Sequence, residues 1–551
     1  MSQMSPAERV GQLVLVSFPG VAPDLDSEIA ALIRDYGIGG VILRPANGNF
    51  GVQRIDPLTL ISMTNQLQSL AEQASQAPSP SNERGDEKGD AFYIPLFVAT
   101  PPSAEGLPLT AYISQTTSLP TPMALGATWD ETLAETAGYV MGRELSVLGI
   151  NLFLGPDLDV MLTPRPGDLS DLGTRVFGSH PFWVGELGRA YIQGMHQGSE
   201  QRMLVVPRHL PGLGGADRSV SEEIPTIQKS LAELEQNELA PFFAAMEEDP
   251  GADLAADGVL VTHNRYRGFE GNIRISTQPI SLDAQALQLL MELEQVADWR
   301  EAGGVLVSDN LGLRSIREFY NPEGTSFNAR RVVQEALIAG NDLLILDKFS
   351  ADGEWTTHFA NVRDTLEFLT ALYESDTTFQ SIVDEAVYRV LQMKLRAFPE
   401  FSLPAVSVAP GEAEAILAEE RSVGAQTAMN ALTLIFPLSE DLLPSPPRED
   451  ETMVIFTQEY DVQSLAGGPA LPLLQQDTLS RAIQRFYGPQ GTGVIELGTI
   501  QSFTFSQLRR ALETGPQPVV VEPPPASEEP EEPEGSEVEG EAGQEEGEGE
   551  G

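Results

Sequence analysis

The sequence of 551 residues contains no cysteine. Disulfide bonds, thiolate nucleophiles and cysteine-ligated zinc or iron–sulfur centres are therefore excluded. Basic residues are scarce, with 33 Lys and Arg against 81 Asp and Glu, and the formal net charge is -48. Nucleic acids and anionic membrane surfaces are bound through basic patches, so this balance argues against both as partners.

Long hydrophobic runs are also lacking. No stretch approaches the roughly 18 apolar residues of a membrane span. The amino terminus, "MSQMSPAERVGQLVLVSFPG", has no basic flank followed by a long apolar run, so no signal peptide is predicted. This predicts a cytoplasmic protein by default, or a secreted one if a leader is missing from this sequence.

The chain is too long for one ordinary core, and two polar segments divide it. The last thirty residues carry 13 Glu and no Lys or Arg. Such a segment cannot bury enough apolar surface to fold, so a disordered acidic tail is predicted over 521–551. A second polar run, 74–90, predicts a mobile surface insertion.

Seven short apolar runs, each bounded by Gly or Pro or by polar residues, recur along the first 400 residues. They lie at 39–43, 94–99, 150–156, 203–209, 258–263, 303–310 and 342–347. Continuous runs of this length are typical of strands buried on both faces, as in parallel sheets. Amphipathic helical patterns separate them, for example over 132–149 and over 328–342, where Gly340 predicts a helix end.

This alternation predicts an α/β fold with a TIM-type (β/α)8 barrel over 1–400, although no eighth strand stands out. A GxGxxG motif is missing where a dinucleotide fold would place it. After residue 400 a Pro-rich stretch precedes one helix pattern and one strand pattern. We therefore predict a short second α/β domain over 401–520.

Polar side chains follow several of the predicted strands, where the active site of such a barrel lies. Asp157 and Asp159 follow the third run, Arg208 and His209 end the fourth, His263 ends the fifth, and Asp309 lies next to the end of the sixth. Arg175 lies in a loop beyond the third run. This combination of carboxylate, arginine and histidine suits glycosidic or phosphate-ester chemistry better than acyl transfer.

Many motifs then agree in order with one known family. The stretches "IRDYGIGGVIL", "MALGATWD", "GINLFLGPDLDV", "RVFGSHP", "RHLPG", "GGVLVSDNLGL" and "ALIAGNDLLIL" resemble glycoside hydrolase family 3, most of all its β-N-acetylhexosaminidase branch. The resemblance covers roughly residues 5 to 400 and implies the barrel predicted above.

The resemblance implies a role for each site residue. Asp309 corresponds to the nucleophile that forms a covalent glycosyl-enzyme, with net retention at the anomeric carbon. Arg208 and His209 correspond to a Lys-His pair that holds sugar hydroxyls, and Arg175 to a loop arginine that contacts the sugar. Asp159 and His263 are also expected to line the substrate site. No metal and no organic cofactor are implied.

Several positions depart from the family pattern, and the most important of them lie in one loop. The hexosaminidase branch carries an Asp-x-His acid/base dyad in the loop after "RHLPG", and the matching positions here are Ser219, Val220 and Ser221. A hydroxyl cannot serve as an acid/base near neutral pH. Asp217, Glu222 and Glu223 are the local carboxylates that could replace it.

Two functions from different classes follow. The first is an O-glycosyl hydrolase that acts on β-linked N-acetylglucosamine or glucose with retention. The second is a catalytically degenerate barrel that binds a glycan or a protein partner without turnover. A carbohydrate substrate or ligand is the partner expected first, and the oligomeric state is left open.

Overall fold

The computed structural model describes residues 1–50, 55–76, 92–104, 107–165, 171–323, 326–417, 421–433, 445–458, 460–462, 471–496 and 498–515. The chain divides into two compact units, Met1–Pro444 with Asp461–Leu471, and Ser445–Tyr460 with Pro472–Gly551. The predicted domain boundaries at 400 and 520 stay predictions. The acidic tail over 521–551 and most of the predicted insertion, 77–90, lie outside the described residues.

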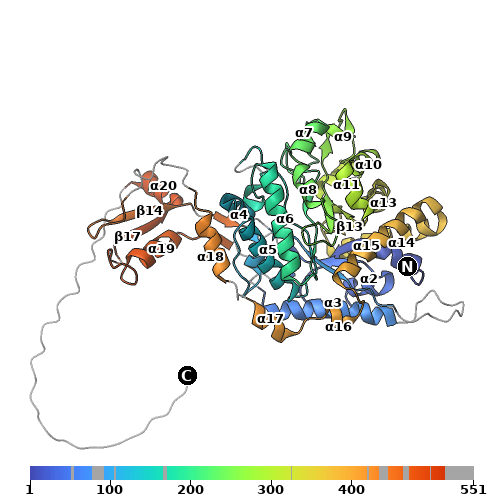
Figure 1. Cartoon of the computed structure of the whole chain (residues 1–551), viewed down its shortest axis with the longest axis horizontal. Coiled ribbons are helices and arrows are strands. Elements are labelled where there is room, and N and C mark those ends of the chain that lie inside the picture. The colour runs from blue at the N-terminus through green and yellow to red at the C-terminus, as the bar shows by residue number, and fades with distance from the viewer. Residues whose placement is uncertain are drawn as a thin grey trace, which may run out of the picture. The chain divides into compact units, whose positions relative to one another are not determined.

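A curled parallel sheet organises the first unit, with helices on its outside (Figure 1). Its strand order is β7-β6-β3-β2-β1-β13-β12-β10-β8. The strands are β1 (Val14–Ser17), β2 (Gly40–Ile42), β3 (Phe97–Thr100), β6 (Leu152–Phe153), β7 (Leu204–Val205), β8 (Arg208–Leu210), β10 (Gly258–Val261), β12 (Val305–Asn310) and β13 (Leu343–Leu346). Each predicted apolar run overlaps one of these strands, except that the run 203–209 overlaps both β7 and β8, and the strand missing from the prediction is β1.

The two ends of this strand order belong to one chain segment. Residues 204 and 205 pair with β6, whereas Arg208 and Leu210 pair with β10 a few residues further on. The sheet therefore follows chain order around a circle, as in the (β/α)8 type of fold. The neighbouring strands of this sheet pair in parallel, so their carboxyl ends meet at one side.

Helices connect the strands of the first unit. They are α1 (Pro6–Gly11), α2 (Glu28–Tyr36), α3 (Pro57–Gln76), α4 (Pro122–Thr128), α5 (Glu131–Ser146), α6 (Pro181–Gly198), α7 (Leu231–Gln236), α8 (Ala240–Ala245), α9 (Arg267–Glu270), α10 (Ala284–Met291), α11 (Glu294–Glu301), α12 (Arg314–Tyr320), α13 (Ala329–Ala339), α14 (Trp355–Ser375), α15 (Thr377–Ala397), α16 (Leu403–Val406), α17 (Pro410–Ile416) and α18 (Arg421–Asn430). The helix end predicted at Gly340 is confirmed, since Gly340 caps α13 in the left-handed conformation at φ 117°.

The described residues beyond 450 form four strands and two helices. They are β14 (Met453–Thr457), β15 (Tyr460–Val462), β16 (Leu471–Leu474), β17 (Ile500–Thr504), α19 (Thr478–Tyr487) and α20 (Phe505–Thr514). Within the second unit, β14 and β17 pair in parallel. The helix pattern that the sequence placed in a second domain forms α18, which belongs to the first unit and contacts α4 and α5.

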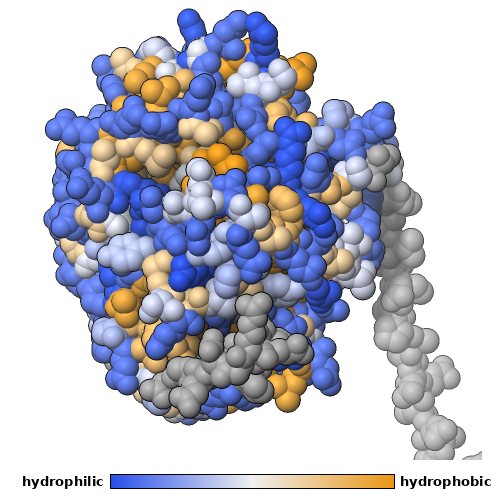
Figure 2. Space-filling model, turned by 90° about the vertical axis from the view of Figure 1, so that its right-hand side faces the viewer, coloured by the Kyte–Doolittle hydropathy of each residue, from blue (hydrophilic) through white to orange (hydrophobic). Residues whose placement is uncertain are grey.

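The surface is consistent with the charge balance of the sequence. Figure 2 shows a face on which hydrophilic residues dominate and apolar residues occur in small separate groups. Within the described ranges, no helix combines the length and the apolar character that crossing a bilayer requires.

A buried histidine joins the starts of two strands on the side of the sheet away from the strand carboxyl ends. His196 of α6 lies 3.0 Å from Asp257 Oδ2 through Nε2 and 2.8 Å from the Asp253 carbonyl through Nδ1. Asp257 also accepts the Val205 N–H at 2.9 Å. Burial alone would lower the pKa of His196, but the carboxylate of Asp257 outweighs it and raises the pKa. Both ring nitrogens can then donate, as in imidazolium.

This arrangement predicts a pH-dependent contribution to stability. A raised pKa means that His196 stabilises the fold fully below the unfolded histidine pKa of about 6.5 and loses this effect as pH rises through the folded value. We expect His196→Gln to lower the free energy of unfolding by about 1–3 kcal/mol at pH 6, and by less at pH 9. Denaturant titrations at both pH values measure this.

The exposed His180 supplies the matched control. His180→Gln should leave the free energy of unfolding unchanged at both pH values. A loss in His196→Gln that is equal at pH 6 and pH 9 would contradict a charged His196.

Candidate active site

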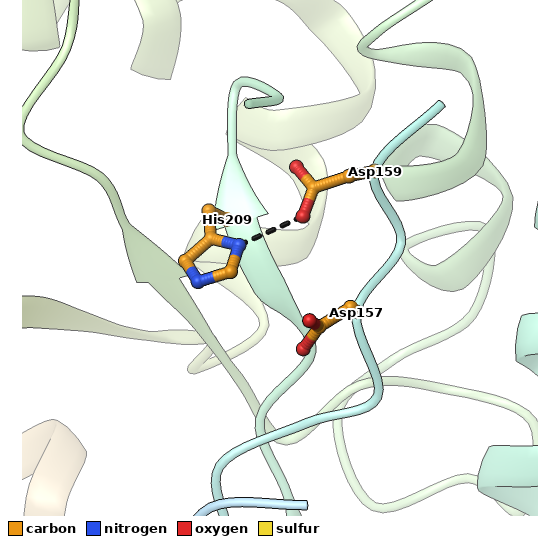
Figure 3. Close-up of side chains that lie close together, drawn as sticks. All are labelled: Asp157, Asp159 and His209. Carbon is orange, nitrogen blue, oxygen red and sulfur yellow. Dashed lines mark hydrogen bonds and ion pairs between the residues drawn. The ribbon is translucent and has the colours of Figure 1, made fainter. Parts of the chain in front are cut away.

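Two hydrogen-bonded pairs connect the ends of β6 and β8. Arg208 Nε donates to Asp157 Oδ1 at 2.5 Å, and His209 Nδ1 lies 2.8 Å from Asp159 Oδ2 (Figure 3). All four residues are buried. The backbone brings them together, because Leu158 N–H donates to the Arg208 carbonyl at 2.7 Å. Adjacent parallel strands thus place two carboxylates opposite two basic groups.

Asp159 holds His209 in one orientation. Its second oxygen, Oδ1, accepts the Leu213 N–H at 2.6 Å, so both carboxylate oxygens have partners. A carboxylate opposite Nδ1 makes that nitrogen the donor and leaves Nε2 of a neutral ring as an acceptor. Among the described residues, His209 Nε2 has no hydrogen bond. Asp159 is therefore a positioning residue, and His209 presents the nitrogen that can meet a ligand.

Asp309 is the next-to-last residue of β12, and it is partly buried. Its Oδ1 accepts the Asn310 N–H at 2.7 Å. Burial would raise the pKa of this carboxyl, but the neighbouring His263, His209 and Arg208 and the Asn310 N–H together lower it. Asp309 is therefore ionised at neutral pH, which is the form that a carboxylate nucleophile requires.

His263 contacts the backbone at the end of β12, next to Asp309. The ring is fully buried, and burial lowers the pKa of its imidazole. Nε2 lies 3.1 Å from the Asn310 carbonyl and Nδ1 lies 2.7 Å from Ser281 Oγ. A carbonyl only accepts, so Nε2 carries the proton and Nδ1 accepts from the hydroxyl. Both ring nitrogens are thus occupied, and His263 acts on the end of β12 instead of offering a free group to a ligand.

Arg175 comes from a short 3-10 turn, Gly173–Arg175, and lies near Asp157. With Thr174 and Asp157 it lines an apolar cavity of about 60 Å³ beside β6. Burial would raise the pKa of Asp157, but Arg208, His209 and Arg175 outweigh it and lower the pKa. Asp157 Oδ2 has no hydrogen bond within the described part of the chain. The sequence places Asp157 with Asp159 among the polar residues that follow the third run.

The three buried groups Asp157, Asp159 and His209 have atoms close enough to share a cation. A cation here would compete with Arg208 for Asp157, and with His209 and the Leu213 N–H for Asp159. A carboxylate that binds a metal ion keeps an oxygen for the ion, whereas both oxygens of Asp159 already have hydrogen-bond partners. The donor set therefore fits a hydrogen-bonded network better than a metal centre.

The three acid/base candidates lie on the loop between β8 and β9 (Thr226–Ile227). Asp217 is exposed and accepts from Arg218 Nη2 at 2.8 Å and from the Thr226 N–H at 2.9 Å. Burial would raise the pKa of Asp217, but these two donors lower it, opposite to what a general acid needs. Glu223 lies 2.7 Å from Arg218 Nη1, and Glu222 is exposed. Within the described chain no hydrogen bond joins any of the three to Asp309.

The family model described as the glycosyl hydrolase family 3 N terminal domain matches residues 6–393 of the sequence. The chain belongs to glycoside hydrolase family 3. The resemblance of its motifs to that family is therefore confirmed, and so is the hexosaminidase branch, because curated relatives carry that name.

Two curated relatives illustrate the likeness of this family 3 chain. It is 27% identical to beta-hexosaminidase A of Pseudoalteromonas piscicida over 304 residues, which cover 54% of this chain and 45% of the relative. It is 26% identical to beta-hexosaminidase LpqI of Mycobacterium bovis over 71% of this chain and 83% of the relative. The chain spans about half the length of the first curated relatives it matches.

Solved structures support the fold. A family 3 beta-N-acetylglucosaminidase from Paenibacillus superposes with a TM-score of 0.67 at 21% identity, over 93% of this chain and 82% of that one. The beta-N-acetylhexosaminidase of Beutenbergia cavernae gives a TM-score of 0.53 at 21% identity, over 72% and 99%. At such identities the likeness concerns the fold alone.

Proposed function

We propose that the protein hydrolyses β-linked N-acetylglucosamine or glucose glycosides with retention, and that Asp309 is the nucleophile. The observation that carries the proposal is the ionised, partly buried Asp309 at the carboxyl end of β12, with Arg208 and His209 nearby. The names of the curated relatives support the substrate class.

The proposed reaction has two steps. An oxygen of Asp309 bonds to the anomeric carbon while the glycosidic C–O bond breaks, and the leaving oxygen takes a proton. Water then attacks the same carbon, the bond between Asp309 and the sugar breaks, and the water proton passes to a base. His209 Nε2 and the guanidinium groups of Arg208 and Arg175 are the groups that hold the sugar hydroxyls. Glu222, Glu223 and Asp217 are the candidate proton carriers.

Trapping the covalent intermediate tests this proposal. The full chain is incubated with 2-deoxy-2-fluoro glucosyl fluoride and with the matching 2-acetamido substrate analogue, and intact mass is recorded. We expect a glycosyl adduct in the parent that is absent from Asp309→Asn. Asp157→Asn is a matched control, because it removes a buried carboxylate that no step uses as nucleophile, and its adduct should persist. A folded parent that forms no adduct with either reagent overturns the proposal.

A further inference from the structure

A groove with a volume of about 680 Å³ opens beside the ends of β10 and β12, and we call it the Phe319 groove. Arg265, Gln278, Ser315, Phe319, Tyr320 and Glu222 contribute to its lining. A space of this size accommodates a ligand of one or two sugar rings. Apart from Glu222, a candidate proton carrier, none of these residues takes part in the proposed catalytic steps.

The chain path places this groove next to the proposed catalytic centre. Arg265 follows His263 by two residues, and Ser315 follows Asp309 by six. Glu222 comes directly after Ser221, in the loop where the family carries its acid/base. An acid/base stands beside the leaving group, so a groove that begins at this loop lies on the side where the leaving group departs.

Arg265 provides the groove with a hydrogen-bond donor that has no partner among the described residues. The residue is only 7% exposed, and Nε and Nη2 donate to the backbone carbonyls of Thr277 and Ile275 at 2.7 and 2.9 Å. The guanidinium lies 5.6 Å from the centre of the Phe319 ring. Within the described residues, Nη1 has no hydrogen bond and Arg265 forms no ion pair. A buried guanidinium fixed in this way presents one set of N–H groups to a ligand.

Ser315 adds a second polar group without a hydrogen-bond partner among the described residues. It is 3% exposed, and its Oγ has no hydrogen-bond partner in the described chain. A buried hydroxyl without a partner is costly unless a ligand or water meets it. Gln278 donates from Nε2 to Glu335 at 2.6 Å, which leaves its carbonyl oxygen available as an acceptor. The groove lining thus combines hydrogen-bond donors and acceptors with the aromatic residues Phe319 and Tyr320.

The charges of the groove favour an uncharged ligand. Glu335 and Glu318 are already paired, with Arg331 at 2.7 Å and with Arg314 at 2.6 Å. Glu222 is exposed at the loop end of the groove and would repel an anion. Alternating hydrogen-bonding groups beside aromatic rings match a pyranose, which has hydroxyls at its edge and C–H groups on its faces.

We propose that the Phe319 groove is the subsite for the leaving group and that it takes a neutral sugar unit. Arg265 Nη1 and Ser315 Oγ bind its hydroxyls, and Phe319 supplies the apolar contact. This inference rests on the proposed function for the identity of the neighbouring site.

Binding without turnover tests it. The full chain with Asp309→Asn is titrated calorimetrically with N-acetylglucosamine, N,N′-diacetylchitobiose, glucose and cellobiose. We expect one of the two disaccharides to bind at least about 10-fold more tightly than its monosaccharide. Ser315→Ala, which breaks no contact in the described chain, and Arg265→Gln should each reduce this ratio several-fold, whereas Arg274→Gln, at an exposed residue of the same loop region, should not.

The outcomes separate the two proposals. Equal affinity for mono- and disaccharides, or a ratio that survives both Ser315→Ala and Arg265→Gln, overturns the subsite, whether or not Asp309 forms an adduct. A missing adduct combined with a disaccharide ratio that depends on Ser315 overturns the hydrolase and leaves the groove as a sugar site.

Discussion

The double substitution Ser219→Asp with Ser221→His is expected to raise kcat/KM on glycosides with a poor leaving group by about 10²–10⁴-fold. An alkyl or sugar alkoxide leaves slowly unless an acid protonates it, and a serine hydroxyl cannot do so near neutral pH. The two hydroxyl oxygens lie 2.7 Å apart, so an Asp and a His placed there are already in reach of each other. The carboxylate would hold the imidazole, as Asp159 holds His209.

Leaving-group dependence measures this prediction. The parent and the double variant are compared on a methyl or disaccharide glycoside and on the 2,4-dinitrophenyl glycoside, whose leaving group needs no proton. The gain should be confined to the poor leaving groups and should bring a bell-shaped pH profile. Ser219→Asn with Ser221→Gln, which has similar volume and no titratable group, is the control. Equal gains on both classes of substrate would show that the substitutions act on something other than proton transfer.

Lys394→Ala is expected to lower the free energy of unfolding by about 3–5 kcal/mol. Lys394 of α15 is fully buried, and Nζ donates to Gln12 Oε1 and to the carbonyls of Gly39 and Pro95 at 2.7–2.8 Å. These acceptors immediately precede β1, β2 and β3. Nζ also lies 4.7 Å from the centre of the Phe97 ring. Removing the side chain leaves Gln12 Oε1 and the Pro95 carbonyl without this donor, whereas the Gly39 carbonyl keeps the Phe97 N–H at 3.0 Å. It also opens a cavity at the start of three strands.

Denaturant unfolding with two companion variants checks this prediction. Lys394→Met keeps the apolar stem and loses only the donors. Its free energy of unfolding should therefore lie between that of the parent and that of Lys394→Ala. Leu395→Ala, at the next position of α15 and 47% exposed, should cost less than about 1 kcal/mol. If Lys394→Met proves as stable as the parent, the hydrogen bonds of Nζ contribute nothing net, and only the packing of its stem does.

The sequence predicts most of the barrel because its buried strands are continuous apolar runs that local composition reveals. The run that became β1 was not recognised as a strand. Its preceding glycine, Gly11, belongs to the end of α1, and its burial depends on β13, whose residues come more than 300 positions later. Periodicity within a short window carries no information about such a partner.

For the site as well, the sequence predicts which residues lie there but not which of them contact each other. Residue types and chain order were enough to assign Asp309, Arg208, His209 and Asp159 to one edge of the sheet. Which of them contact each other was not predictable, because the pairing of Arg208 with Asp157 depends on how β6 and β8 lie beside one another. Lys394 shows the same limit, since its three acceptors come from three separate parts of the chain. That His263 lines the substrate site stays a prediction, and its two buried hydrogen-bond partners could not be read from the sequence.

The pairing of β1 with β13 also affects how the protein is made. Val14 lies opposite Leu344, about 330 positions later in the chain. At a synthesis rate of about 5–20 residues per second, β1 waits roughly 15–70 s on the ribosome before its partner exists. During that time one edge of β1 offers unpaired backbone groups to other chains. Chaperone demand in the cell should therefore be set by the first strand of this barrel, and shortened chains that end before residue 343 should aggregate.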